Sequence, residues 1–248
     1  MIKLSEISTR APKGMEKKNI LKETAALAMR IGDLQHILYA QKKHSILIIL
    51  QGMDASGKDG TARHVFNDCS PTGINAYGFK KPTEEEFDHD FLWRVHKQAP
   101  RKGTITIFNR SHYEDILIQR VHKWIDEKRV EQRMRAINSF EQNLIDDNDT
   151  LILKFYMHLS KERQKVKLQE RMDNPRKQWK HNPDDWKESE HWDKYIRCYE
   201  YAINHSVVPW IIAPVDQRWY RDYFIASRIV EAMESLDLKL PTIKKTTE

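Results

Sequence analysis

The chain has 248 residues, which is enough to bury a sizeable core and fits one α/β domain over residues 1–248. A net charge of +6 favours an anionic partner, and the two cysteines, Cys69 and Cys198, form neither a zinc pattern nor a disulfide framework. The sequence shows no secretory signal and no apolar run long enough to span a bilayer, so we expect a cytoplasmic protein without a membrane partner.

Helical and strand patterns alternate along the chain. We predict a helical extension at 15–43, as one helix or as two joined near Gly32. Strands are predicted at 45–50, 74–79, 104–109, 150–159 and 208–214. Helices are predicted at 59–68, 83–98, 112–122, 129–147, 192–205 and 217–236, with a basic segment at 160–187 and a flexible tail at 241–248. This alternation predicts a doubly wound, mostly parallel five-stranded sheet between two helical layers, an α/β/α fold.

The residues between the first strand and its helix, GMDASGK at 52–58, match the GxxxxGK half of a P-loop. The backbone N–H groups of such a loop point at a phosphate, and Lys58 adds a cation. A glycine-rich turn that contains a lysine by chance is the alternative. The predicted phosphate contacts in this region are Gly52, Ser56, Gly57, Lys58, Asp59 and Gly60.

Two carboxylates in or beside this loop are unexpected next to a phosphate. Unit charges about 4 Å apart repel by roughly 4 kcal/mol at an effective dielectric near 20, and a divalent cation between them reverses the sign. We therefore predict Asp54 as a ligand of Mg²⁺, with Mn²⁺ as a second option. Asp59 is the weaker candidate, because an acidic residue in the first turn of a helix is favourable in any case.

The strand at 104–109 ends in Asn109 and Arg110, at the edge where open α/β sheets bind ligands. The forked donors of Arg110 suit a phosphate, and Asn109 offers a carbonyl oxygen to a metal or to the phosphate site. Glu114 and Asp115 follow at the start of the next helix. Asp115 is a further metal candidate, although the helix dipole alone explains such an acidic pair.

The segment from 161 to 180 contains eight Lys or Arg residues against three acids. Arg163, Lys167 and Arg171 recur at four-residue steps and should share one face of a helix, and Arg176 and Lys177 follow. A solvated basic face is the alternative explanation. The position after the fourth strand is that of the lid of nucleotide kinases, so we predict a helical lid at 160–187 on a P-loop kinase-like fold.

Four segments, in this order, resemble the polyphosphate kinase 2 family over about residues 52–230: GMDASGKDG, LWRVHKQAPRKGTITIFNRSHYEDIL, the stretch from SKERQ to NPRKQWK, and PVDQRWYRDYFIASRIV. The resemblance implies an enzyme that binds inorganic polyphosphate in a basic channel and transfers its terminal phosphoryl group to a nucleotide with magnesium. It gives Asp54 a metal-binding or phosphate-positioning role and Lys58 a role on the transferred phosphate. Arg110 and Arg171 would stabilise developing charge.

The family often has aspartate where this chain has Asn109, so the second ligand of the metal stays open. This substitution resembles the branch of the family that accepts both AMP and ADP. The implied partners are polyphosphate and AMP, ADP and ATP, with guanine nucleotides as a further option, and the implied assembly is a homodimer or homotetramer. We expect no nucleic-acid partner.

Two other functions compete with this one. An ATP-dependent nucleoside or nucleotide kinase would share the P-loop, the arginine at the strand end and the basic lid. A nucleic-acid-binding protein without catalysis would explain the basic balance and the tryptophans, but it leaves Asp54 and Lys58 without a role.

Overall fold

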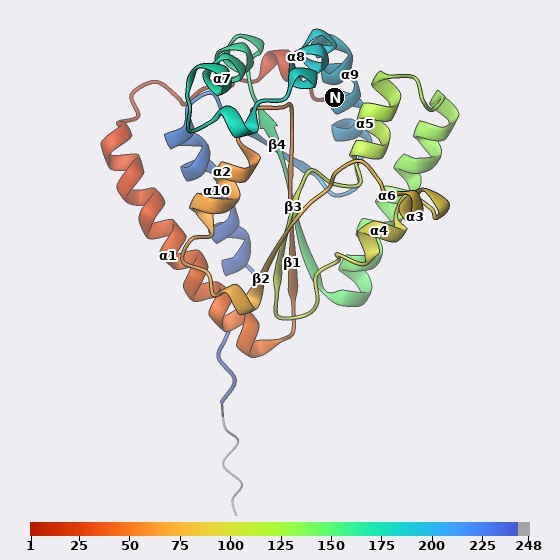
Figure 1. Cartoon of the computed structure of the whole chain (residues 1–248). Coiled ribbons are helices and arrows are strands. Elements are labelled where there is room, and N and C mark those ends of the chain that lie inside the picture. Colours follow the sequence, from red (N-terminus) through yellow and green to blue (C-terminus); the bar gives the residue numbers. More distant parts are fainter. Residues whose placement is uncertain (243–248) are drawn as a thin grey trace, which may run out of the picture.

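The computed structural model of the chain describes residues 1–242, so most of the tail predicted at 241–248 lies outside the described residues. Five parallel strands form one sheet in the order β2-β3-β1-β4-β5, which confirms the predicted doubly wound α/β fold (Figure 1). The strands are β1 (Ser45–Gln51), β2 (Ile74–Gly78), β3 (Ile105–Asn109), β4 (Thr150–His158) and β5 (Trp210–Pro214).

Strand β1 lies at the centre of the sheet, and all seven of its residues are buried. Its aliphatic run has no polar face because helices cover both sides of the sheet. Leu50 on β1 is in register with Asn109 on β3, so the loops that follow these two strands leave the sheet side by side. This register brings the P-loop next to Arg110.

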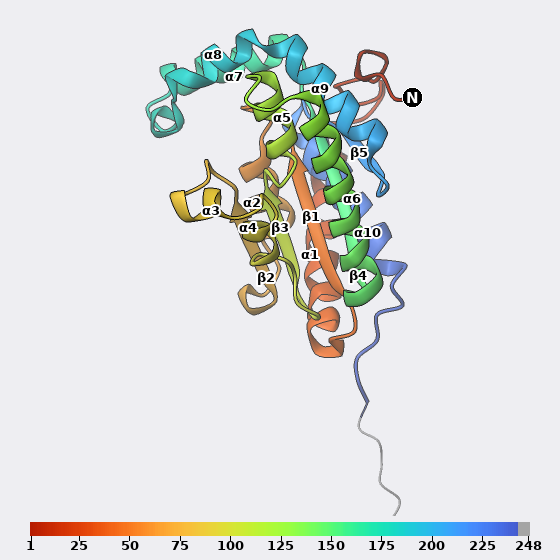
Figure 2. The same cartoon turned by 90° about the vertical axis from the view of Figure 1, so that its right-hand side faces the viewer.

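Helices pack on both faces of the sheet (Figures 1 and 2). One face carries α1 (Lys17–Gln41), α2 (Lys58–Val65) and α10 (Arg218–Glu234), and the other carries α4 (Trp93–His96), α5 (Glu114–Val121), α6 (Glu127–Asn148) and α9 (Trp192–His205). Two separate hydrophobic clusters fill the spaces between these layers and the sheet. The short elements η2 (Pro71–Gly73) and α3 (Glu84–Asp88) lie in connections, and η1 (Leu4–Glu6) lies near the N-terminus, before α1.

The helical extension at 15–43 is one helix, α1, that passes through Gly32 without a break. A Cβ at this position would lie 2.6 Å from the carbonyl oxygen of Asp68, just after α2. Glycine therefore allows the two backbones to approach, and it does not end the helix.

The single helix predicted at 83–98 is wrong, because the structure has two short helices there. The predicted capping box is present: Thr83 Oγ1 accepts from the N–H of Glu86 at 3.2 Å, and Glu86 Oε2 accepts from the N–H of Thr83 at 3.0 Å. Asp90 then separates α3 from α4, since its Oδ1 accepts from the N–H of Leu92 at 2.9 Å. Such a local bond competes with helix continuation.

The lid comprises α7 (Lys161–Asp173), η3 (Gln178–Lys180) and α8 (Pro183–Glu190), and it lies over the carboxyl end of the sheet (Figure 2). An N-terminal arm, residues 1–13, crosses the same end of the molecule. Thr9 Oγ1 donates to Asp216 Oδ2 at 2.8 Å, and the N–H of Asp216 donates to the carbonyl of Thr9 at 3.0 Å. Within residues 1–242, no helix combines the length and the apolar character required to cross a membrane.

Candidate active site

The P-loop turns sharply between β1 and α2. Ala55 and Gly57 both have left-handed backbones, with φ of 65° and 98°. A Cβ at Gly57 would also lie 2.0 Å from Nη1 of Arg221 on α10. Glycine is therefore required twice at this position, for the turn and for the close packing of an arginine against the loop.

Lys58 begins α2 and folds back over the loop. Its Nζ donates to the carbonyl oxygens of Gly52 at 2.9 Å and Met53 at 3.2 Å, and the residue is 8% exposed. Burial and the charge of Arg110 lower the pKa of Lys58 to about 8, although nearby carboxylates, Asp54 first among them, favour its charged form. The ammonium thus lies at the phosphate-binding turn, held only by neutral acceptors.

Asp54 and Arg110 form an ion pair across the mouth of the loop. Burial opposes ionisation of Asp54, but Arg110, Lys58 and Arg171 outweigh it and hold the pKa of this carboxyl below its ordinary value. Arg110 has φ of 63°, a left-handed conformation that is strained for a residue with a side chain and is common at functional sites. Its pKa is raised, chiefly by Glu114 and then by Asp54. The carboxylate of Asp54 is therefore a common neighbour of three predicted catalytic cations.

Asp59 connects the strand end to the lid. It accepts a hydrogen bond from the side-chain amide of Asn109 and pairs with Nζ of Lys180 at 3.1 Å. Burial acts against ionisation, but the bonds from Lys180 and Asn109 lower the pKa of Asp59. These contacts give Asp59 a role in holding the lid over the loop.

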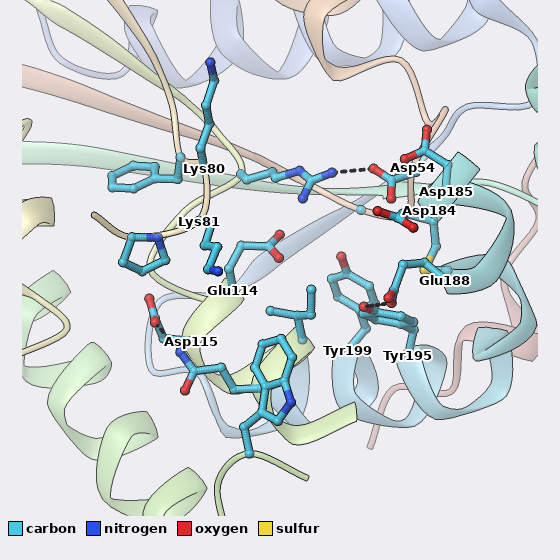
Figure 3. A pocket seen from close by; sticks show the side chains of 18 of the residues that line it. Asp54, Lys80, Lys81, Glu114, Asp115, Asp184, Asp185, Glu188, Tyr195 and Tyr199 are labelled. Atoms are coloured by element: carbon cyan, nitrogen blue, oxygen red, sulfur yellow. Dashed lines mark hydrogen bonds and ion pairs between the residues drawn. The ribbon is translucent and has the colours of Figure 1, made fainter. Parts of the chain in front are cut away.

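Two further contacts join the lid to the site. Gln164 on α7 donates from Nε2 to the carbonyl of Asp54 at 3.1 Å, and Arg171 is paired with Asp185 on α8. Burial raises the pKa of Asp185, and the second cause is the charge of Asp54, which places the two carboxylates close to each other. Figure 3 shows both on the same wall of a cavity.

This cavity has a volume of about 950 Å³ and lies between the P-loop, the lid and α5 (Figure 3). One part of its wall is apolar and comprises Pro82, Phe87, Ile118, Trp124 and Ile125. Another is charged and comprises Asp54, Lys80, Lys81, Arg94, Arg110, Glu114, Asp115, Arg133, Asp184, Asp185, Lys187 and Glu188. The hollow can therefore hold a ligand that has a flat apolar end and an anionic end.

Asp115, a predicted metal candidate, lies in the wall of this cavity beside an arginine. Arg94 Nη2 lies 3.4 Å from its Oδ2, and Gln119 donates to its Oδ1 at 2.8 Å. Burial raises the pKa of Asp115 to about 6 despite the charge of Arg94. This carboxyl supports the wall of the site through these two partners.

A buried glutamine at the end of β1 orients several side chains of the site. Gln51 donates from Nε2 to Glu114 and to the hydroxyl of Tyr199, the latter at 3.3 Å, and its Oε1 accepts from Ser111 Oγ at 3.1 Å. Sequence reasoning did not select Gln51, because a polar residue at a strand end has an ordinary structural explanation. It named Glu114 with Asp115 as an acidic pair at a helix start, but it did not predict the contact of Glu114 with Gln51.

The other predicted lid residues, Arg163, Lys167, Arg176 and Lys177, lie away from the large cavity. Arg163 lines a second, smaller cavity, and Lys167 lies near Arg163 and Arg221. Lys177 pairs with Glu170 at 2.7 Å, and Arg176 is exposed, and neither of these two lines the large cavity. Arg221, which packs on the P-loop from α10, was not predicted because it follows the loop by more than 150 residues.

Within the described residues, no three His, Cys, Asp or Glu side chains form a ready metal cluster. Two neighbouring carboxylates, Asp54 and Asp185, do face the phosphate-binding region. Magnesium is usually held by one or two carboxylates together with substrate phosphates, so this pair fits such an ion without a full protein cage.

Comparisons with known proteins found a matching family model and similar sequences. The family model described as polyphosphate kinase 2 matches residues 14–241. The chain is 43% identical over 235 residues to an AMP/ADP-polyphosphate phosphotransferase of Meiothermus ruber, covering 94% of this chain and 88% of that protein. It is 39% identical over 227 residues to an ADP-polyphosphate phosphotransferase of Rhodopseudomonas palustris, covering 86% and 78%.

A solved structure shares the fold over nearly the whole chain. The crystal structure of polyphosphate kinase 2 from Arthrobacter aurescens TC1 superposes with a TM-score of 0.94 at 36% identity and covers 98% of this chain and 89% of that one. The P-loop, the lid and the helices on both faces of the sheet are therefore parts of one shared architecture.

Proposed function

Because the chain belongs to the polyphosphate kinase 2 family, we propose that it transfers the terminal phosphoryl group of inorganic polyphosphate to AMP, ADP or both. The observation that carries this proposal is the ion pair of Arg110 with Asp54 at the mouth of the P-loop, where Lys58 begins α2 and where the charges of Lys58 and Arg171 also lower the pKa of Asp54. Such a cluster can neutralise two polyanions that approach each other.

The large cavity suits the nucleotide. Its apolar wall, with Phe87 and Trp124 exposed to it, offers flat surfaces to a base. Lys80, Lys81 and Arg110 offer positive charge to the nucleotide's phosphates, and Tyr195 and Tyr199 line the same space. Gly52, Met53 and Asp54 of the P-loop line the same cavity, so the phosphate end of a bound nucleotide would face the loop.

The basic side chains of the lid and of α10 suit the polyphosphate. Arg221 packs against Gly57 and Gly60 of the P-loop, and Arg163 lines the second cavity. Burial and then the charges of Arg221 and Arg163 lower the pKa of Lys167, as expected if Lys167 lies near both arginines. A polyphosphate chain has no bases to recognise, so its binding depends on such a row of cations. The acceptor and the donor would thus approach the P-loop from two different cavities.

The chemical step needs charge neutralisation more than a base. The attacking oxygen of AMP or ADP is already largely ionised near neutral pH, since the second pKa of a phosphate is about 6. Lys58 and Arg110 would leave their present acceptors, the loop carbonyls and Asp54, and bind the transferring group. Arg171 would do the same from the lid, and the closed lid would exclude water.

Members of this family are phosphotransferases that use a divalent metal, and we propose Mg²⁺, with Mn²⁺ as a substitute. Asp54 would hold it, with Asp185 as the nearest second carboxylate; Asn109 is a weaker ligand because its amide is bonded to Asp59. The metal supplies charge stabilisation on the phosphate oxygens when bound.

We also propose that the protein assembles into a dimer or tetramer and that it is located in the cytoplasm.

The test is phosphoryl transfer without ATP. The enzyme is incubated with magnesium, polyphosphate and either AMP or ADP, and ADP and ATP are quantified over time. Formation of ADP from AMP, or of ATP from ADP, is the expected result. Product that forms only when ATP is the donor would overturn the proposal in favour of an ordinary nucleotide kinase. The Lys58→Ala variant controls for contaminating kinases.

A further inference from the structure

A fully buried ion pair lies outside both cavities, and the mechanism above makes no use of it. It joins Lys154 on β4 to Glu141 on α6, and Nζ of Lys154 donates to Oε2 of Glu141 at 2.6 Å. Removing two charges from water is costly, and an apolar pair of similar volume is often as stable or more stable. The stability of the core therefore does not by itself account for this pair.

The ion pair holds two residues of the turn that follows Arg110. The hydroxyl of Tyr113 donates to Oε1 of Glu141 at 3.0 Å and accepts from Nζ of Lys154 at 2.7 Å. Nε2 of His112 lies 3.2 Å from the same carboxylate oxygen, and burial lowers the pKa of this fully buried imidazole, so the neutral ring donates to Glu141. These four side chains, of Glu141, Lys154, His112 and Tyr113, form one buried network.

The turn is also fixed to the central strand. Ser111 is fully buried, and its Oγ donates to Oε1 of Gln51 at 3.1 Å and accepts from the N–H of Tyr113 at 3.2 Å. The N–H of Arg110 donates to the carbonyl of Leu50 at 3.0 Å. Each of the three residues after Arg110 is therefore anchored by its own side chain.

Arg110 needs such an anchor because of its backbone. Its φ of 63° is sparsely populated by residues with a side chain, and such a conformation persists only where the surrounding structure over-determines it. The guanidinium itself is 37% exposed and is paired with Asp54 alone. If the turn relaxed to an ordinary backbone, the side chain of Arg110 would leave the mouth of the P-loop.

We propose that Glu141 and Lys154 are positioning residues, which fix the turn through His112 and Tyr113 and so aim Arg110 at the transferring phosphoryl group. This inference rests on the proposed function. Neither residue of the ion pair lines the large cavity, so their effect on the reaction passes through Arg110. It should lower kcat more than it raises KM, because Lys80 and Lys81 still face the nucleotide.

The experiment replaces the ion pair in two ways in the full-length enzyme. The apolar double variant, Glu141→Leu with Lys154→Met, removes both charges and leaves neither unpaired. The conservative double variant, Glu141→Gln with Lys154→Met, keeps an acceptor for His112 and Tyr113. With magnesium, polyphosphate and ADP, we expect kcat to fall roughly tenfold in the apolar double variant, since a small misplacement of a catalytic group is costly. The conservative double variant should recover most of this loss.

The dependence on Arg110 separates positioning from a general structural role. Both double variants are also made in the Arg110→Ala enzyme, where the apolar double variant should lower kcat no further, because no guanidinium remains to be positioned. A further tenfold loss in that background overturns the inference, and so does a normal kcat in the apolar double variant alone.

Thr150→Val is the matched control for lost stability. Its hydroxyl is buried at the other end of β4, 2.8 Å from Oγ of Ser45, and the variant should keep its kcat. A loss in this control equal to that of the apolar double variant overturns the inference. Circular dichroism checks folding. If the apolar double variant does not fold, Tyr113→Phe replaces it, with an expected loss of roughly threefold for one hydrogen bond and the same dependence on Arg110.

Hydrogen exchange gives a readout that needs no activity. The backbone amides of 111–116 should exchange faster in the apolar double variant than in the wild type or in Thr150→Val. Unchanged exchange overturns the inference. If the wild type forms no product from polyphosphate with AMP or ADP, the proposed function fails, and hydrogen exchange alone decides whether the network fixes the turn.

Discussion

The P-loop and the lid bring cations to the same edge of the sheet, but they hold them in different ways. Lys58 is 8% exposed and bonded to backbone carbonyls of its own loop. Lys180 in the lid is bonded to Asp59, whose side chain is 67% exposed. An exposed ion pair is worth only about 0.2–1 kcal/mol, so an incoming phosphate can replace it at little cost. We therefore expect the P-loop to fix where a phosphate binds and the lid contact to yield to it.

The ion pair of Arg171 is less exposed than that of Lys180, but it is not fully buried. Its partner Asp185 is only 13% exposed, and the two lie on different helices of the lid. This pair holds α7 against α8 and keeps Arg171 near Asp54. The four predictions below test this difference between the buried cation of the loop and the more exposed cations of the lid.

The largest effect is expected from the fixed cations. Lys58→Ala and Arg110→Ala should each lower kcat by roughly 10²- to 10³-fold, because each removes a preorganised charge from the transferring phosphoryl group. Steady-state kinetics with polyphosphate and ADP measure this loss, and circular dichroism checks that the fold is retained. Arg110→Lys keeps the charge but loses the forked guanidinium donors, so its kcat should lie between those of the wild type and of Arg110→Ala. Near-normal turnover in either alanine variant removes that residue from the catalytic set.

A smaller but still large effect is expected for the carboxylate of the loop. Asp54→Asn should lower kcat by about tenfold or more, since the charge stabilisation that a bound metal supplies is worth several kcal/mol. It should also raise the magnesium concentration required for half-maximal rate. Asp59→Asn is the matched control, because Asp59 contacts the lid. Equal magnesium requirements in the two variants would contradict the assignment of Asp54 as the ligand.

The pH dependence follows from the low pKa of Lys58, about 8. The amine is charged below this pH and becomes neutral as pH rises through it, so phosphate binding should weaken on the alkaline side. We expect kcat/KM to fall above a pH of about 8. Lys167 has a similar pKa, about 8, and Lys167→Arg separates its contribution. If the variant shows the same alkaline limb, the limb belongs to Lys58, and a flat profile to pH 10 in the wild type contradicts both assignments.

The smallest effect is expected from the exposed contact of the lid. Lys180→Ala removes the bond to Asp59 and should raise KM by no more than about fivefold, the range of an exposed ion pair, with kcat nearly retained. Lys165→Ala, an exposed lysine on α7, is the control and should change neither constant. A loss of kcat as large as that of Lys58→Ala would show that the lid is part of the fixed machinery.

The sequence predicted the fixed part of the site better than the lid. The P-loop follows a buried strand and precedes a helix, so local pattern alone determines its geometry, and the structure brings Asp54, Lys58 and Arg110 together. Arg110 could be predicted because parallel strands end at one edge of the sheet. Site roles for these residues stay proposals until the variants are measured.

The partners within the lid could not be predicted in the same way. Asp184 and Asp185 follow Asn182 and Pro183, a normal helix start, and nothing in that pattern indicates that one acid pairs with Arg171. The contact of Arg221 with Gly57 depends on how α10 packs beside α2, a long-range arrangement. Both contacts depend on how distant segments of the chain pack together, whereas sequence patterns indicate only contacts between near neighbours.

The N-terminal arm has a consequence for how the molecule matures. Ile2 and Asn204 exchange two hydrogen bonds, at 2.6 and 2.9 Å, and Leu4 donates its N–H to Glu200 at 2.8 Å. The ribosome makes the arm first, yet its docking partners emerge some 200 residues later, as the sequence separation of 202 between Ile2 and Asn204 shows. The arm therefore cannot reach its native contacts until the chain has been made at least as far as Asn204.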